Sequence, residues 1–248
     1  MRPEPRRGPA WEIAISHALL RRVAAREVPP VVRIYRPAPT LAFGRLDQIA
    51  AGFPSAVREA RSCAFEPVLR LAGGHAAAYG PGSVVCEEIV AADRAFEGVE
   101  QRYDSFVDRL RAVLGALGAE VAIGALPGEY CAGRHSLNVG GRTKVAGVAQ
   151  RVVKGGALVS AVIVVAGGDA LREVLTAVYG SLGVELEPRT IGALEDELPG
   201  ASVDDLVPRL AAAFADSGTP DTEPARSTAT LGIAAELLRR HTIAESGS

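Results

Sequence analysis

The sequence predicts an α+β fold with a mixed, largely antiparallel sheet flanked by helices. The chain has 248 residues, of which 48% are hydrophobic, so it can bury one sizeable core. Apolar segments of strand length occur in hairpin-like pairs as well as beside amphipathic helices, and the chain has no internal repeat. Strands paired in this way favour an α+β arrangement over a doubly wound parallel sheet.

The first third of the chain alternates helix and strand signals. An amphipathic helix is expected over residues 11–25, because apolar side chains recur there at helical spacing. Residues 31–37 alternate and are β-branched, and a second short strand follows at 39–44 beyond the proline break. A helix at 52–62 leads into a strand, a glycine-rich turn and another strand within 67–91.

The remaining two thirds repeat these patterns. Residues 157–165 form a continuous apolar run that is typical of a buried strand. Residues 187–200 are expected to form a loop, and Asp169 and Ser202 are candidate caps of the helices that follow them. Helices are expected over residues 105–118, 168–183, 203–216 and 231–244.

Composition suggests one main domain with extended ends. Residues 1–10 are rich in proline and arginine without an apolar run, which predicts a solvated N-terminal tail rather than a signal peptide. The main domain is expected over 11–215. Residues 216–228 are polar and rich in Pro, Ser and Thr, so they predict a linker, and 229–248 should hold a C-terminal helix.

Charge and hydropathy argue against two classes of partner. The formal net charge is only −2, which gives no electrostatic reason to expect a nucleic acid or a membrane surface as a partner. The chain also lacks an apolar run of about 18 residues, the length that a membrane-spanning helix needs. The sequence therefore predicts a cytoplasmic protein.

The cysteines do not form a recognisable framework. Cys63, Cys86 and Cys131 are an odd number at wide spacings, which argues against disulfides. They lack a CxxC or Cys/His pairing, so no metal site is expected. Each cysteine is then either a small buried hydrophobic residue or a reactive thiol.

A glycine-rich turn follows the strand that ends near Arg70. Gly73 and Gly74 can bring the backbone close to a ligand, and Arg70 could bind a phosphate or carboxylate. The two common phosphate-binding motifs, GxGxxG and GxxxxGK[ST], are absent. On these residues alone, an ordinary hairpin with an exposed arginine is the simpler interpretation.

The segment PGEYCAGRHSLNVGGRTKVAGVAQR contains two candidate reactive groups. Lys144 stands on a strand of small and apolar residues, where a lysine costs free energy unless it meets an anion or an oxygen-rich ligand. The alternative is a solvated edge lysine. Cys131 lies in a loop near Arg134 and His135, cations that could lower its thiol pKa and make it a nucleophile.

Two ordered motifs resemble the lipoate–protein ligase and octanoyltransferase family, which shares its catalytic domain with the biotin ligases. One is Arg-x-x-Gly-Gly followed by a small-residue strand, and the other is GRTKVAGVAQ after a hairpin. PTLAFGRLDQ, upstream of both, is similar to the family's strand and turn. The resemblance spans roughly residues 11–215 and implies the biotin/lipoate ligase-like catalytic domain there.

The resemblance implies a tunnel for an octanoyl or lipoyl group. Lys144 would hydrogen-bond the acyl carbonyl oxygen, and Cys131 would carry the acyl group as a thioester before a target lysine receives it. Such a transferase needs no cofactor or metal, and its partners would be acyl carrier protein or a lipoyl-domain protein. The residues that would bind the substrate are Arg70, Gly73, Gly74, His75, Tyr79, Gly147 and Ala149.

Two alternatives to the transferase remain at the level of sequence. One is an ATP-dependent lipoate–protein ligase, which would use ATP and Mg and form a lipoyl-adenylate. The other is a non-catalytic homologue that binds an acyl chain or a lipoyl domain. The loop reads CAGRHS rather than Asn-Asp, and few residues follow the linker, so the sequence favours the transferase.

Overall fold

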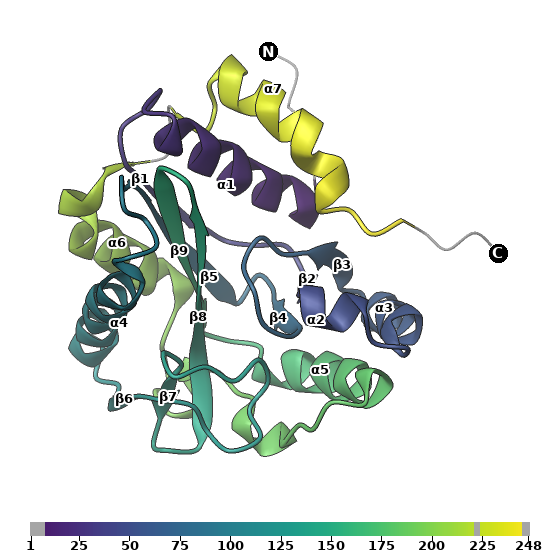
Figure 1. Ribbon diagram of the computed structural model, residues 1–248. Helices are drawn as coiled ribbons and strands as arrows, with labels where there is room; N and C mark the ends of the chain where they lie inside the picture. Colours follow the sequence, from purple (N-terminus) through teal and green to yellow (C-terminus); the bar gives the residue numbers. More distant parts are fainter. Residues whose placement is uncertain (1–7, 221–223, 245–248) are drawn as a thin grey trace, which may run out of the picture.

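The protein is built on two sheets, as seen in the computed structural model, which describes residues 8–220 and 224–244 (Figure 1). The large sheet has seven strands in the order β10-β1-β5-β9-β8-β7-β6, and all its pairs are antiparallel except β1 with β10. Its strands are β1 (Val31–Tyr35), β5 (Ser83–Ala91), β6 (Val121–Ile123), β7 (Leu137–Val139), β8 (Thr143–Val153), β9 (Gly156–Val164) and β10 (Thr219–Pro220).

The small sheet has three strands in the order β3-β2-β4, with β2 parallel to β3 and antiparallel to β4. They are β2 (Thr40–Phe43), β3 (Glu66–Leu69) and β4 (Ala77–Tyr79). The helices are α1 (Pro9–Ala24), α2 (Arg45–Gln48), α3 (Phe53–Ser62), α4 (Val99–Ala116), α5 (Gly168–Leu182), α6 (Val203–Ala213) and α7 (Thr228–Leu237). The prediction of an α+β fold with a mixed, largely antiparallel sheet flanked by helices is confirmed.

Alternation along the central strands directs side chains to two different cores. On one face of the large sheet, Val84 and Ile163 pack with Phe106 of α4 and Leu210 of α6. On the other face, Ile89 packs against α1 in a second cluster. Leu41, Phe43 and Ala78 of the small sheet pack with residues of α3 and α5 in a third cluster. The large sheet is therefore covered on both faces, with α4 and α6 on one flank and α1 on the other (Figure 1).

Most of the predicted elements are present, with shifted ends. Helix α1 begins at Pro9, a residue well suited to a first helical turn, two residues before the predicted start. Ser202 caps α6 as expected, since its Oγ accepts a hydrogen bond from the backbone N–H of Asp205 at 3.1 Å. Asp169 was the wrong cap for α5, because Gly167 in the left-handed region occupies that position. The expected loop at 187–200 contains two short 3-10 turns.

The C-terminal segment returns to the N-terminal helix. Helix α7 lies alongside α1 (Figure 1), and its Ala234 and Leu237 belong to the same apolar cluster as Leu20 of α1. Before α7, Thr219 pairs with Val31 at the edge of the large sheet. Residues 1–7 of the expected tail and residues 221–223 of the expected linker lie outside the described residues. Among the described residues, no helix is both long enough and apolar enough to cross a membrane.

Two histidines join α1 to the C-terminal segment. His17 Nδ1 lies 3.1 Å from His241 Nε2, and His241 Nδ1 lies 2.8 Å from the carbonyl oxygen of Leu69. The carbonyl can only accept, so His241 carries its proton on Nδ1, and its Nε2 accepts from His17. A proton added to Nε2 of His241 would bring two N–H groups face to face and break this contact.

The contact should make the protein less stable in acid. Burial, and then the proximity of His241, lower the pKa of His17 from 6.5 to about 4. Above pH 6.5 His17 is neutral in both the folded and the unfolded chain, so the full contribution of the contact to the free energy of unfolding is present. As the pH falls toward 4, the unfolded chain binds a proton that the folded chain does not, so the free energy of unfolding should fall by about 1–2 kcal/mol. Guanidinium denaturation over this pH range measures the effect.

The matched control is His17→Gln, which keeps a neutral donor facing His241. Between pH 6.5 and pH 4, the free energy of unfolding of this variant should depend less on pH than that of the wild type. An equal acid loss in the variant and the wild type would show that the histidine contact is not the titrating element.

Candidate active site

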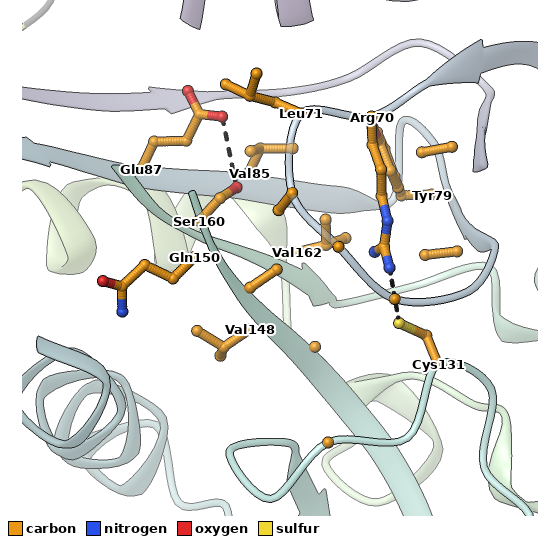
Figure 2. A pocket seen from close by; sticks show the side chains of 18 of the residues that line it. Arg70, Leu71, Tyr79, Val85, Glu87, Cys131, Val148, Gln150, Ser160 and Val162 are labelled. Atoms are coloured by element: carbon orange, nitrogen blue, oxygen red, sulfur yellow. Dashed lines mark hydrogen bonds between the residues drawn. The ribbon is translucent and has the colours of Figure 1, made fainter. Parts of the chain in front are cut away.

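A cavity of about 340 Å³ lies between the large sheet, the small sheet and α1. Its floor comes from the central strands, where Val85 of β5 and Val162 of β9 lie side by side (Figure 2). Gly147 of β8 pairs with Val162 on its other side. Of the residues predicted to form the site, all but His75 line this cavity: Arg70, Gly73, Gly74, Tyr79, Cys131, Lys144, Gly147 and Ala149. The fold thus gathers segments far apart in sequence around one apolar space.

The side chain of His75 contacts Asp47 and does not line the cavity. Its Nδ1 lies 2.8 Å from Oδ1 of Asp47, a fully buried carboxylate whose Oδ2 accepts from the N–H of Gly44 at 2.7 Å. His75 is not among the residues that line the cavity, although the preceding Gly74 is. The contact with Asp47 ties the glycine-rich turn to α2.

The glycine-rich turn packs directly against Cys131 at Gly74. Gly74 has φ +96, and a Cβ there would lie 2.2 Å from Arg70 Nη2 and 2.8 Å from Cys131 Sγ. The positive φ strains any L side chain at this position, and its Cβ would also have to displace the Arg70 guanidinium and the Cys131 sulfur. A Cβ at Gly73, by contrast, would meet nothing within 4 Å. The two adjacent glycines therefore do different things: Gly74 allows the close approach of sulfur and arginine, and Gly73 leaves open space.

Cys131 is held in a strained conformation with its sulfur beside a cation. Its φ of 42 lies in the left-handed region, which non-glycine residues rarely adopt. Its backbone N–H donates to Tyr179 Oη at 2.7 Å, and that hydroxyl donates to the carbonyl of Ala76 at 2.9 Å. Arg70 Nη2 donates to Cys131 Sγ at 3.0 Å (Figure 2). This contact places a positively charged group directly against the sulfur.

The expectation that Arg134 and His135 would act on the sulfur is wrong. Arg134 forms an ion pair with Glu100 of α4, and the ring of His135 stacks on Tyr103 with centroids 4.2 Å apart. Both side chains point toward α4, because the loop turns sharply after Cys131. The cation beside the sulfur comes instead from Arg70, which is 61 positions away in the chain.

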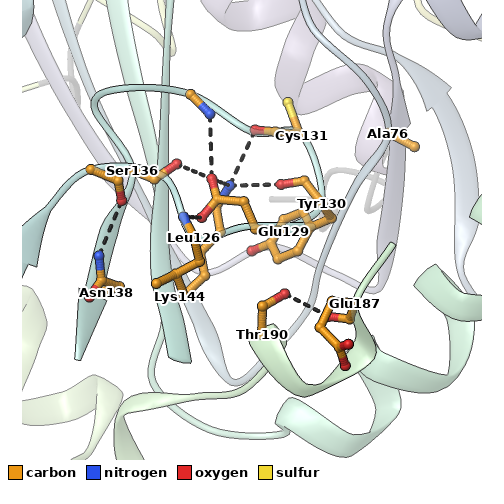
Figure 3. A network of polar contacts seen from close by, with 12 residues as sticks. Ala76, Leu126, Glu129, Tyr130, Cys131, Ser136, Asn138, Lys144, Glu187 and Thr190 are labelled. Atoms are coloured by element: carbon orange, nitrogen blue, oxygen red, sulfur yellow. Dashed lines mark hydrogen bonds and ion pairs between the residues drawn. The ribbon is translucent and has the colours of Figure 1, made fainter. Parts of the chain in front are cut away.

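Lys144 is buried and meets oxygen atoms on three sides. Its side chain is 1% exposed, and its Nζ donates to Glu129 Oε1 at 2.9 Å, to the carbonyl of Tyr130 at 2.8 Å and to that of Cys131 at 3.2 Å (Figure 3). The ammonium also lies 4.4 Å from the centre of the Tyr130 ring. Burial lowers the pKa of Lys144, and the charge of Glu129 opposes that shift. The ammonium of Lys144 therefore holds the backbone of the cysteine loop through the carbonyl oxygens of Tyr130 and Cys131.

Glu129 is a central residue that the sequence interpretation missed. Its side chain is fully buried, and besides Lys144 it accepts from Ser136 Oγ at 2.5 Å and from the N–H of Leu126 at 2.9 Å. The anion that Lys144 was expected to need thus comes from the protein itself. The available signal was an acidic residue two positions before the loop cysteine, on the chain segment facing the lysine strand.

Within the part of the chain that the structure describes, no group of three or more His, Cys, Asp or Glu side chains is placed to hold a metal ion. Two cations at the site, Arg70 and Lys144, are instead directed at the sulfur and at carboxylate and carbonyl oxygens. Such an arrangement suits stabilisation of a thiolate and of an oxyanion.

The Lys144–Glu129 pair should contribute far more to stability than a surface pair. Lys144→Met leaves Glu129 as an uncompensated buried carboxylate, which should lower the free energy of unfolding by about 3–5 kcal/mol. The control is Arg142→Met, whose guanidinium pairs with Glu197 2.6 Å away on the surface, where about 0–1 kcal/mol is expected. Denaturant unfolding compares the two, and equal losses would contradict a structural role for the buried pair.

Comparison with known proteins agrees with this geometry. A model of the lipoyl protein ligase A/B catalytic domain matches residues 8–215. An octanoyl-[GcvH]:protein N-octanoyltransferase of Geobacillus kaustophilus is 31% identical over 75% of this chain and 65% of its own length. Enzymes of the same name from Oceanobacillus iheyensis and Kyrpidia tusciae are 27% and 34% identical, over 79% and 71% of this chain and 74% and 57% of their own lengths.

Solved structures share the fold at low identity. A lipoate-protein ligase A bound with ATP superposes with a TM-score of 0.71 at 16% identity, over 93% of this chain and 90% of its own. A bipartite lipoate protein ligase from Thermoplasma acidophilum superposes with a TM-score of 0.68 at 16% identity, over 93% and 88%. Since the family model covers most of the chain, this protein belongs to the lipoyl protein ligase A/B catalytic domain family.

Proposed function

We propose that this chain transfers an octanoyl or lipoyl group to the lysine of a lipoyl-domain protein through a thioester on Cys131. The observation that carries the proposal is the placement of the Cys131 sulfur beside the Arg70 guanidinium, at one end of an apolar cavity. The names of the relatives support it, since they are octanoyltransferases whose names include GcvH. The chain spans 65% and 57% of the first and third of these relatives.

The proposed reaction has two balanced steps. In the first, the Cys131 thiolate attacks the acyl carbonyl carbon of the donor, either acyl carrier protein or a lipoyl-domain protein. The bond from that carbon to the donor's sulfur or nitrogen breaks, and the leaving group takes up a proton. In the second, the ε-amine of the acceptor lysine attacks the thioester, the carbon–sulfur bond breaks, and an amide forms with loss of a proton. Arg70 stabilises the thiolate at the start and again as the leaving group.

Lys144 would act on the oxyanion only by exchanging an acceptor. Its three N–H donors already point at Glu129, Tyr130 and Cys131, and the contact with the Cys131 carbonyl is the longest at 3.2 Å. The acyl oxygen would take the place of that carbonyl as negative charge develops. In this proposal, Glu129 keeps the ammonium in place during the exchange.

Mass spectrometry of the intact protein tests the thioester. Incubation with octanoyl-acyl carrier protein should add one octanoyl group, and Cys131→Ser should abolish the adduct. The matched control is Cys63→Ser, because Cys63 is also a partly exposed free cysteine but lies outside the cavity. An adduct that persists in Cys131→Ser would exclude this mechanism.

The same variants separate the proposal from its alternatives. A ligase that uses ATP and Mg would release pyrophosphate in the presence of lipoate and would continue to do so as Cys131→Ala. A non-catalytic homologue would bind the acyl group without forming an adduct or transferring it.

The two adjacent glycines offer a sharper test of the geometry. Gly74→Ala forces a methyl group into the space of Cys131 Sγ and Arg70 Nη2, so the rate of adduct formation should fall by about 100-fold or more. Gly73→Ala places its methyl in open space and should lower the rate far less. Stopped reactions analysed by mass spectrometry give both rates, and equal effects of the two substitutions would contradict the packing of sulfur against the turn.

A further inference from the structure

Cys131 is held by its backbone from two different elements. Its N–H donates to Tyr179 Oη of α5 at 2.7 Å, and its carbonyl oxygen accepts from Lys144 Nζ of β8 at 3.2 Å (Figure 3). Lys144 already has a task in the proposed acyl transfer. Tyr179 has none, although its hydroxyl touches the peptide group of the reacting residue.

The Tyr179 hydroxyl also joins the two segments that form the site. It donates to the carbonyl oxygen of Ala76 at 2.9 Å, between Gly74 and the start of β4. One oxygen atom therefore accepts from the cysteine loop and donates to the glycine-rich turn. The tyrosine is 1% exposed and packs in the apolar cluster that includes α3 and α5, so neighbouring side chains hold its ring in place. Burial raises the pKa of Tyr179, so the hydroxyl keeps the proton that it donates.

Hydrogen bonds on both sides of the Cα explain how Cys131 keeps an unfavourable backbone. Its φ of 42 lies in the left-handed region, which costs free energy for a residue with a Cβ. The N–H belongs to the planar peptide group before the Cα and the C=O to the one after it, so bonds to both fix the two dihedral angles together. This backbone places Sγ 3.0 Å from Arg70 Nη2. Rotation to a negative φ would change the direction of the Cα–Cβ bond and move the sulfur out of this contact.

On this basis, and resting on the proposed acyl transfer, we propose that Tyr179 is a positioning residue for the nucleophile. Its hydroxyl holds the N–H of Cys131 next to the glycine-rich turn and so keeps the sulfur beside Arg70. Tyr179 is not among the residues that line the cavity, so it acts through Cys131 and not on the acyl group. The alternative is a tyrosine that only stabilises the core.

The rate constant of thioester formation separates these two roles. Tyr179→Phe removes the hydroxyl and keeps the buried ring. At saturating octanoyl-acyl carrier protein, the rate constant of adduct formation should fall about tenfold or more, because the sulfur loses its alignment. The donor concentration at half the maximal rate and the final extent, one octanoyl group per protein, should not change. An unchanged rate constant would overturn the proposal, and so would a lower extent at that same rate constant, which is the result of unfolding alone.

Thr230→Val is the matched control. Thr230 of α7 is fully buried, and its Oγ1 accepts from Arg22 Nη1 at 2.8 Å and donates to the carbonyl oxygen of Pro224 at 2.6 Å. It lies outside the cavity. Both variants lose a buried hydroxyl that is hydrogen-bonded on two sides, so denaturant unfolding should show comparable losses of stability. The rate constant of Thr230→Val should equal that of the wild type. An equal fall of the rate constant in both variants would refute a specific role of Tyr179.

Amide hydrogen exchange of the full-length wild-type protein tests the anchor without transfer and without a variant. The N–H of Cys131 should exchange far more slowly than that of its exposed neighbour Ala132, because the Tyr179 hydroxyl accepts it. NMR spectroscopy resolves the two amides. Equal exchange of both would refute the anchor, and this measurement decides the proposal if Tyr179→Phe does not fold.

The two measurements together distinguish this inference from the proposed function. A protected Cys131 amide in a wild-type protein that forms no adduct would refute the thioester mechanism and retain the anchoring of Cys131 by Tyr179. Adducts that form equally fast in the wild type and in Tyr179→Phe would retain the mechanism and refute the positioning role.

Discussion

The contact between Lys144 and Glu129 holds the candidate site together. A buried ammonium is costly, and here its cost is offset by one carboxylate, two backbone carbonyls and an aromatic ring. Because those carbonyls belong to Tyr130 and Cys131, the same contacts that neutralise the lysine also determine the path of the cysteine loop. The charge pair on β8 and the position of the sulfur are thus one structural unit.

Close backbone approach supplies the second constraint. Gly74 brings the glycine-rich turn against the sulfur, and a Cβ at Gly44 would lie 1.6 Å from the carbonyl oxygen of Gly74. The turn is therefore packed between the loop after β2 and the cysteine loop. Arg70, at the start of the turn, reaches the sulfur because Gly74 lacks a side chain that would separate the two segments.

The sequence supports some of these assignments better than others. Alternation and helical spacing predict the strands and helices because burial imposes those periods locally. The order of the two glycine motifs predicts that Arg70 and Lys144 share a site. Glu129 was missed, because an acidic residue in a loop carries no mark of the partner that neutralises it. Arg134 and His135 were misassigned for the converse reason, since nearness in sequence does not imply nearness in space.

The sequence by itself determined the α+β class, most of the elements and the residues that gather at the cavity, because these follow from hydrophobic period, glycine placement and motif order. Only the tertiary structure decided which cation meets the sulfur and which anion meets the lysine. Those features are contacts between different segments of the chain, such as Arg70 with Cys131 and Lys144 with Glu129. Their distances depend on sheet register and loop packing, neither of which a local pattern specifies.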